Sequence, residues 1–480
     1  MAPPTALAAA LAALSLAFAL APSTARANGR FPTAQHVVVG PGAASNVIAL
    51  RTTFGMLLSR DEGRTFVWLC EEGMFFPLVP SLNFDAPVEV ASSGSVVFGY
   101  EDGIRYTSDA CKADDARNAA HRVFSDLTAD PTGRILYAVE AAQGMPNAVY
   151  RGNGDDYAFT RMGDGVRDVL FDTIEVAPSN PMRLYLTGRS AEGFSAVFYR
   201  SDDGGATLTP ITPDGGAADS LWVSGVDPTQ PDTVFVRAAL GLGTELRRSL
   251  DGGRSFRPVA STPDPMLGFA ISDDGRTVWV GSISAGLLRS DDGGETFRQV
   301  NRLPVLCLRQ HANTLWACSD WINTPFALGR SSDRGASFTP VVTFSNFASF
   351  VGPPSCETRS EGADICVERW PTLRRSLESS EVDGGATDAG RRDAAADAPF
   401  DAPSDATRDA AVDAPRDATF DAVTDIVAAD AAPGARPGGS CDCRVGSAPV
   451  APRPDWILAA VALAGASRRR VRNRVATAIR

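Results

Sequence analysis

Short apolar runs separated by polar turns fill residues 33–350 of the chain. One recurring pattern is an apolar run, a Pro-containing turn and a second apolar run, as in Ile174 to Leu186 and Trp222 to Val236. No segment of this region has the 3.6-residue period of an amphipathic helix. Runs of this length, rich in β-branched and aromatic residues, are typical of strands. The pattern therefore predicts a nearly all-β region.

An eight-residue phrase with the consensus Ser-x-Asp-x-Gly-x-Ser/Thr-aromatic recurs in this region. Weaker copies begin at residues 108 and 152, and successive copies are 41 to 49 residues apart. The defining residues of the five clear copies are Ser59, Asp61, Gly63 and Phe66; Ser201, Asp203 and Gly205; Ser249, Asp251, Gly253 and Phe256; Ser290, Asp292, Gly294 and Phe297; and Ser331, Asp333, Gly335 and Phe338.

We call this phrase the Ser-Asp turn and expect it to be structural. Its Asp can accept hydrogen bonds from backbone N–H groups of its own turn. Its Gly can take a positive φ, and its aromatic residue begins the next strand. A catalytic or calcium-binding role for these Asp residues is the weaker alternative.

The two repeated phrases together predict four strands in each unit of about 45 residues. Four-stranded units of this length, repeated radially, are the blades of a β-propeller. We therefore predict an all-β, seven-bladed β-propeller over residues 28–354, followed by a cap segment that contains cysteines over residues 355–375.

The Ser-Asp turn resembles the Asp-box, or BNR repeat, of sialidase-like and sortilin-like propellers. The resemblance covers roughly residues 33–350 and implies the propeller fold. It implies little about activity, because Asp boxes stabilise blades away from the usual ligand face, and a shared fold does not establish a shared function.

Both ends of the chain differ from the repeats in composition. Residues 1–27 are predicted to be an export signal, with an apolar run from Leu7 to Ala21 before a small-residue cleavage site. Residues 376–437 are predicted to be a disordered Asp/Ala/Pro-rich linker. Residues 383–430 hold twelve Asp and four Arg, so they carry eight of the twelve net negative charges of the chain. The repeats show no basic face, so no nucleic acid is expected as a partner.

Residues 438–480 combine cysteines, a short apolar run and an arginine cluster. This arrangement resembles the MYXO-CTERM sorting signal of myxobacterial surface proteins. The resemblance implies processing near Cys441 or Cys443 and retention of Arg468, Arg469 and Arg470 at the cytoplasmic side during export. We expect an exported chain displayed at the cell surface or outer membrane, in contact with a membrane only through this tail.

Six cysteines lie in or just after the repeats, and export would permit them to form disulfides. They are Cys70, Cys111, Cys307, Cys318, Cys356 and Cys366. Cys307 and Cys318 flank a short turn and are expected to face each other across a hairpin. Cys356 with Cys366, and Cys70 with Cys111, are the remaining tentative pairs among the fifteen possible connectivities. A metal site is not expected.

Glycoside hydrolysis of the sialidase type is the only enzyme class with any support. It requires three arginines for a substrate carboxylate, a Tyr nucleophile with a Glu partner, and an acidic proton donor. Arg30 fits the first arginine motif, but the other two arginines and the Tyr–Glu pair cannot be placed. His36, His121 and His311 are isolated in the sequence and are expected to be structural or exposed. No phosphate-binding loop or dinucleotide motif is present, and no cofactor is expected.

A non-enzymatic binding or protein-interaction module is better supported, with a surface protein or a glycan as partner and a monomer as the expected state. An assembly factor for an envelope complex is a further alternative. The apolar stretch from Gly73 to Leu78 is interpreted as core in preference to a contact patch. Candidate binding residues come from loops on the face opposite the Ser-Asp turns: Arg51, Tyr100, Glu101, Arg189, Asp320 and Trp321.

Overall fold

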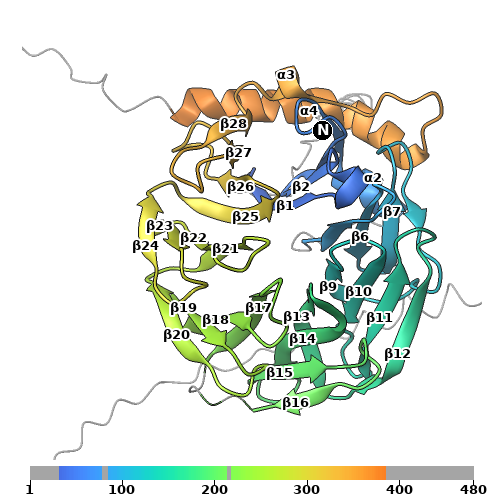
Figure 1. Cartoon of the computed structure of the whole chain (residues 1–480). Helices are drawn as coiled ribbons and strands as arrows, with labels where there is room; N and C mark the ends of the chain where they lie inside the picture. The colour runs from blue at the N-terminus through green and yellow to red at the C-terminus, as the bar shows by residue number, and fades with distance from the viewer. Residues whose placement is uncertain (1–31, 78–84, 213, 215–217, 385–480) are drawn as a thin grey trace, which may run out of the picture. The chain divides into compact units, whose positions relative to one another are not determined.

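The computed structural model describes residues 32–77, 85–212, 214 and 218–384. Its strands form seven sheets placed side by side in a ring (Figure 1). The first strands of neighbouring sheets lie against one another, and β1 of the first sheet meets β25 of the last. The predicted seven-bladed β-propeller is therefore confirmed.

Each blade uses four consecutive strands. Blades 1 and 2 contain β1 Ala34–Val39, β2 Ile48–Thr52, β3 Gly55–Ser59 and β4 Phe66–Leu69, then β5 Val88–Val90, β6 Val96–Tyr100, β7 Gly103–Thr107 and β8 Asp114–Asp115. Blades 3 and 4 contain β9 Phe124–Ala129, β10 Ile135–Glu140, β11 Asn147–Asn153 and β12 Phe159–Val166, then β13 Val169–Ala177, β14 Asn180–Ser190, β15 Ala196–Ser201 and β16 Thr209–Ile211.

The remaining three blades repeat this order. Blade 5 contains β17 Ser220–Val226, β18 Val234–Leu240, β19 Gly243–Ser249 and β20 Arg257–Thr262. Blade 6 contains β21 Met266–Ile271, β22 Val278–Ser282, β23 Gly286–Ser290 and β24 Arg298–Asn301, and blade 7 contains β25 Val305–His311, β26 Thr314–Ser319, β27 Leu328–Ser331 and β28 Thr339–Val342. The helical segments are η1 Gly42–Ala44, α2 Glu71–Phe75, α3 Phe347–Phe350 and α4 Glu361–Gly384.

The antiparallel order gives the ring two different faces. Turns between the first and second strands, and between the third and fourth, lie on one face, which we call the Ser-Asp face. Turns between the second and third strands, and the connections between blades, lie on the other, which we call the opposite face. All seven copies of the phrase fall between the third and fourth strands of a blade, as the spacing predicted.

The Ser-Asp turns close on their own hydrogen bonds. In blade 7 the Ser331 hydroxyl donates to Asp333 Oδ1 at 2.7 Å and accepts the Gly335 N–H at 2.8 Å. Asp333 also accepts the Ser337 N–H at 2.9 Å. Hydrogen bonds from Ser337 and Ser331 lower the pKa of Asp333 to about 2. These carboxylates are occupied by their own turns, as expected for a structural role.

The glycine of each turn also makes room for the preceding blade. Gly253 of blade 5 has φ +89°, and a Cβ placed there would lie 2.2 Å from Phe198 Cε1 of blade 4. Gly294 and Gly335 stand in the same relation to Phe235 and Leu287. Conformational freedom, which the sequence suggested, is therefore only part of the reason for glycine here.

Gly253→Ala should destabilise the protein by about 2–4 kcal/mol, because it combines a strained φ with overpacking against buried Phe198. Gly241→Ala is the matched control, since Gly241 has φ +63° and no atom within 4 Å of the added Cβ. The free energy of unfolding in urea would measure both. Equal losses in the two variants would contradict the packing argument.

The C-terminal part of the described chain returns to blade 1. Strand β29, Val351–Gly352, adds a fifth strand parallel to β4, and α4 packs across α2. Disulfides join Cys70 to Cys366 and Cys111 to Cys356. The tentative Cys70–Cys111 and Cys356–Cys366 pairs are therefore wrong. The two cysteines of the returning segment, Cys356 and Cys366, bond instead to cysteines of blades 2 and 1. The expected Cys307–Cys318 pair is confirmed.

Helix α4 was not anticipated. It begins in the cap segment and ends at Gly384, so the boundary placed between residues 375 and 376 falls inside it. Its described core residues Ala363, Cys366 and Leu377 are buried, and Trp370 packs against Trp68 and Phe347. Among the described residues, no helix has the length and apolar character needed to cross a membrane. The predicted export signal, most of the linker and the sorting tail lie outside the described residues.

Candidate functional site

Two of the six candidate binding residues are core residues. Trp321 is 8% exposed, donates its indole N–H to Pro32 O at 2.7 Å and packs against Phe344. Tyr100 is 4% exposed and stacks on Phe75, with the Arg105 guanidinium over its ring. Neither ring presents a free face to a ligand, so both residues belong to the core and not to an exposed binding surface. Trp321 instead helps to join the last blade to the first.

The stretch that begins at Gly73 is core over its first three residues, whereas Phe76 is half-buried and Pro77 is exposed. Gly73, Met74 and Phe75 are buried in α2, which confirms the favoured interpretation for these three residues. The end of the stretch at Leu78 lies outside the described residues.

The other four candidates lie apart from one another. Glu101 is exposed in the turn between β6 and β7. Asp320 accepts the Ile322 N–H at 3.1 Å within its own loop, and Arg189 lies in β14, paired with Asp172 at 2.9 Å. Arg51 lies in β2 rather than in a loop and takes part in a cluster at the centre of the ring.

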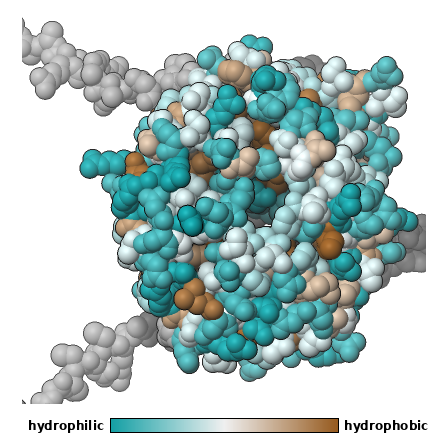
Figure 2. Space-filling view, viewed as in Figure 1, coloured by the Kyte–Doolittle hydropathy of each residue, from teal (hydrophilic) through white to brown (hydrophobic). Residues whose placement is uncertain are grey.

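The centre of the ring holds seven titratable side chains from six blades. They act on one another electrostatically although they come from opposite sides of the ring, so they face the central channel. Figure 2 shows that the molecular surface is hollowed at the middle of the ring. We call these residues the channel cluster: His36, Arg51, Glu89, Asp126, Glu175, Arg237 and Arg309.

Three members of the cluster tie neighbouring blades together. Arg51 Nη1 donates to Ala86 O at 2.8 Å, where the chain enters blade 2. Arg237 Nη1 donates to Met266 O at 2.5 Å, where it enters blade 6. Asp126 of blade 3 accepts the Ile174 N–H of blade 4 at 2.9 Å. Innermost strands have one open edge, and these side chains satisfy backbone groups along it.

Burial dominates the electrostatics of the acidic members. It raises the pKa of Glu89 to about 7, against the attraction of Arg309, and the pKa of Asp126 to about 6. Burial, with repulsion from Asp126 and Glu89, raises the pKa of Glu175 to about 8. Burial and the nearby arginines Arg51 and Arg309 lower the pKa of His36 to about 3. Near neutral pH the channel therefore holds charged guanidinium groups beside carboxyl groups that partly keep their protons.

The other four members satisfy no described backbone group of a neighbouring blade. Glu89 is only 8% exposed, and its carboxyl accepts one hydrogen bond, from the Val90 N–H. Within the described ranges, the side chains of Arg309 and His36 form no hydrogen bond or ion pair. Glu175 accepts a single long hydrogen bond, from the Thr128 hydroxyl at 3.3 Å. These groups act on one another electrostatically, so they lie in the same region of the ring.

Sequence reasoning missed all of the cluster except Arg51. A signal was present, because Glu89 and Glu175 each interrupt an apolar first strand, as Val88-Glu-Val90 and Ile174-Glu-Val176. Buried charges in such runs are rare without a specific role. The assembly itself could not be seen, since its members are up to 273 residues apart in the chain.

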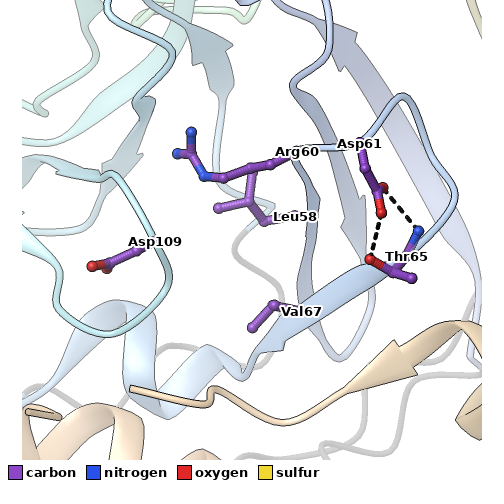
Figure 3. Close-up of a pocket in the computed structure, with 6 residues that line it drawn as sticks. All are labelled: Leu58, Arg60, Asp61, Thr65, Val67 and Asp109. Atoms are coloured by element: carbon purple, nitrogen blue, oxygen red, sulfur yellow. Dashed lines mark hydrogen bonds between the residues drawn. The ribbon is translucent and has the colours of Figure 1, made fainter. Parts of the chain in front are cut away.

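A small pocket on the Ser-Asp face is a weaker candidate for a ligand site than the channel cluster. It has a volume of about 170 Å³ and lies between blades 1 and 2 (Figure 3). Asp61 accepts the Thr65 N–H at 2.9 Å and the Thr65 hydroxyl at 2.7 Å, and Arg60 reaches Gly94 O at 3.1 Å. These polar groups are used by the turn and by the contact between blades. The residues that line the pocket are Leu58, Arg60, Asp61, Thr65, Val67 and Asp109.

Exposed large apolar side chains gather on the opposite face. Of the ten such residues in the described ranges, eight lie in turns between second and third strands or at the entry to a blade. Five of them occupy the turns of five consecutive blades, and Leu242 is 90% and Phe194 59% exposed. We call these five the apolar rim: Met145, Phe194, Leu242, Ile283 and Ile322. Only Met182 and Leu250 lie on the Ser-Asp face.

A sialidase-type arrangement lacks one element among the described residues. The channel holds three arginines, but two of them bind backbone carbonyls of neighbouring blades. All seven tyrosines lie in the described ranges, and none forms a hydrogen bond with a member of the channel cluster. His121, which was expected to be structural or exposed, is exposed on the opposite face, with its Nδ1 3.0 Å from Asp102 Oδ1. No group of three His, Cys, Asp or Glu residues with the arrangement of metal ligands occurs in the described part of the chain.

Comparisons with known proteins place this chain in no family. No family model and no curated protein matches the sequence. A GH74 enzyme from Niastella koreensis is 15% identical, with a TM-score of 0.33 over 65% of this chain and 64% of its own. A GH74 xyloglucanase from Xanthomonas campestris is 14% identical, with a TM-score of 0.32 over 64% of each chain. This chain thus spans less than two thirds of either enzyme.

Hydrazine synthase from Kuenenia stuttgartiensis is a third similar structure. It is 11% identical, with a TM-score of 0.41 over 64% of this chain and 98% of its own. Similarity at this level carries no argument about activity.

Proposed function

We propose that this protein is a non-enzymatic binding module displayed outside the cell, which docks a partner protein on the face opposite the Ser-Asp turns. The apolar rim carries the proposal. Single exposed apolar residues are common on proteins, but eight of ten on one face is an uneven distribution, and gathered apolar groups rimmed by polar residues are typical of interaction surfaces.

Charge favours a partner with basic groups around an apolar centre. Acidic side chains accompany the rim, among them Glu101, Asp168, Glu192, Asp219 and Asp320. Complementary charge would steer such a partner and set its orientation. A glycan without basic groups would gain less binding free energy from the apolar rim and the carboxylates beside it.

Display outside the cell is supported by the sequence and by the cysteines. The predicted export signal and the MYXO-CTERM-like tail both favour it. The six cysteines of the described region form three disulfides, which persist in oxidising compartments and are rare in the cytosol. An envelope assembly factor would be one form of the same proposal, differing in the identity of the partner.

Photo-crosslinking on intact cells would test the docking face. A photoreactive residue at Phe194 or Leu242 should capture one defined protein, whereas the same residue at Leu250, which is 54% exposed on the Ser-Asp face, should not. With that protein purified, the double variant Phe194→Asp/Leu242→Asp should weaken binding by about tenfold or more, and Leu250→Asp should leave it unchanged. Equal capture from both faces, or capture only of a second copy of this chain, would contradict the proposal.

A further inference from the structure

The channel cluster contains groups that neither the fold nor the proposed docking face uses. Arg51, Arg237 and Asp126 each satisfy a backbone group of a neighbouring blade, which accounts for their presence. Among the residues that the structure describes, Arg309 and Glu89 form no such hydrogen bond with the backbone of a neighbouring blade. A guanidinium and a carboxyl within electrostatic reach of each other would ordinarily pair, yet no ion pair joins them.

The unused groups leave hydrogen-bonding capacity facing the channel. Arg309 presents five N–H donors without an acceptor among the described residues. Glu89 is more than nine-tenths buried, and only a backbone N–H meets its carboxyl. In the same cluster, Arg237 Nε is buried without a partner in the described part of the chain. Buried polar atoms left unsatisfied cost free energy, so a bound group that satisfied several of them would gain affinity.

The balance of charge favours an anion. Arg51, Arg237 and Arg309 are charged at all relevant pH values, and His36 is neutral near pH 7. Of the three carboxyl groups, those of Glu89 and Glu175 hold their protons for part or most of the time near neutral pH. A carboxylic acid that keeps its proton is a hydrogen-bond donor, so the available members of the cluster together offer donors rather than acceptors.

We propose that the centre of the channel binds a small oxyanion, held by the Arg309 guanidinium, with Glu89 and Glu175 donating hydrogen bonds in their protonated forms. Guanidinium groups bind carboxylate and tetrahedral oxyanions through paired, charge-assisted hydrogen bonds. Each carboxyl must carry a proton to face an anion, so binding is coupled to proton uptake. Asp126, Arg51, Arg237 and His36 are the other titratable groups that face the site.

Calorimetric titration of the full chain with sodium sulfate and with sodium acetate, at pH 6.0 and pH 8.5, would test this site. Both probes keep nearly constant charge over this interval, so any change in affinity reports on the protein. Affinity should fall by at least about tenfold from pH 6.0 to pH 8.5, because the fraction of protein in the competent protonation state falls by that factor or more. The heat of binding at pH 7 should depend on the ionisation enthalpy of the buffer, as proton uptake requires.

Three variants separate the roles of the residues. Arg309→Gln should lose binding at both pH values, whereas Arg330→Gln, an exposed arginine of the same blade, should bind as the unaltered chain does. Glu89→Gln/Glu175→Gln keeps neutral donors at both positions, so it should bind and lose most of the pH dependence. That double variant also tests the proposal if Arg309→Gln fails to fold.

Each possible result of these titrations either supports or overturns the proposal. Binding of sulfate alone would identify a tetrahedral oxyanion site, and binding of acetate alone a carboxylate site; either supports the proposal. No binding of either probe at pH 6.0, affinity independent of pH, or unchanged affinity in Arg309→Gln would overturn it. Arg309→Gln should still crosslink through Phe194, and Phe194→Asp/Leu242→Asp should still bind the oxyanion, so failure here is distinguishable from failure of the docking proposal.

Discussion

Replacing Cys70 and Cys366 with alanine should release the C-terminal helix from the propeller and cost about 4 kcal/mol in the free energy of unfolding. The disulfide joins α4 to the end of blade 1, and both cysteines are buried. Because Cys111–Cys356 already links the same two regions, the ring that Cys70–Cys366 closes contains about 50 residues, and a crosslink of that size removes about 4 kcal/mol of chain entropy from the unfolded state.

Two readouts separate this effect from general destabilisation. Urea unfolding would give the change in free energy, and limited trypsin digestion at Arg374 and Arg375 would report on α4. Cleavage there should be much faster in the variant, because α4 is held by the disulfide, by the contact of Trp370 with Trp68 and by Arg369 with Glu72 at 3.1 Å. Alanine is chosen because serine would place unpaired hydroxyl groups in the core.

Cys307→Ala/Cys318→Ala is the matched control. That disulfide spans 11 residues within one hairpin of blade 7 and forms no covalent link to α4. The chain-entropy model gives it about 3 kcal/mol, so it also lowers stability. It should leave the rate of cleavage at Arg374 and Arg375 unchanged. Equal acceleration of cleavage in both variants would contradict the role assigned to Cys70–Cys366.

The return of the chain to blade 1 marks the limit of what local sequence could predict. The blades were predictable because each Ser-Asp turn contains its own hydrogen-bonding partners within a few residues, from Ser331 to Ser337 in blade 7. Strand β29 and α4 instead find their partners nearly 300 residues earlier, at Phe66 and Cys70. Short-range patterns contain no information about contacts of that separation, so proximity in sequence suggested the wrong cysteine pairs.

For the candidate site residues, too, local sequence predicted some features and missed those that depend on distant segments. Loop position placed Glu101 in a turn of the opposite face, where its side chain is exposed. It could not indicate that Tyr100 and Trp321 turn inward, because their partners Phe75 and Phe344 come from other segments. The channel cluster was harder to predict from the sequence, because each of six blades supplies only one or two of its members. Charged residues within apolar first strands were its only local sign.

Glu175→Gln should remove much of the pH dependence of stability between pH 5 and pH 8.5. In the folded protein, burial and the neighbouring Asp126 and Glu89 raise the pKa of Glu175 to about 8, well above the value of about 4.3 in an unfolded chain. Between these two pH values the folded state binds the proton and the unfolded state does not. The free energy of unfolding therefore falls as pH rises through this window.

The glutamine variant has no proton to lose at this position and keeps an acceptor for Thr128. Its free energy of unfolding should match that of the unaltered chain near pH 5 and exceed it by about 2 kcal/mol at pH 8.5. This is less than the whole pKa shift would give, because the side chain has some access to solvent in the channel. Urea unfolding at half-unit pH steps would measure this. Glu192→Gln, in the exposed turn of the same blade, should follow the unaltered curve throughout.

A Glu175→Gln curve parallel to that of the unaltered chain would mean that Glu175 ionises freely in the channel. Its carboxylate would then meet an incoming anion as a like charge, and protonated donors could not form the proposed oxyanion site near neutral pH. A flatter curve would show instead that the folded protein holds a proton in the channel where the unfolded chain does not. Oxyanion binding requires this retained proton. Stability should therefore fall with rising pH up to the folded-state pKa of Glu175, about 8, and the affinity for sulfate or acetate should fall as pH rises past the folded-state pKa values of Glu89 and Glu175.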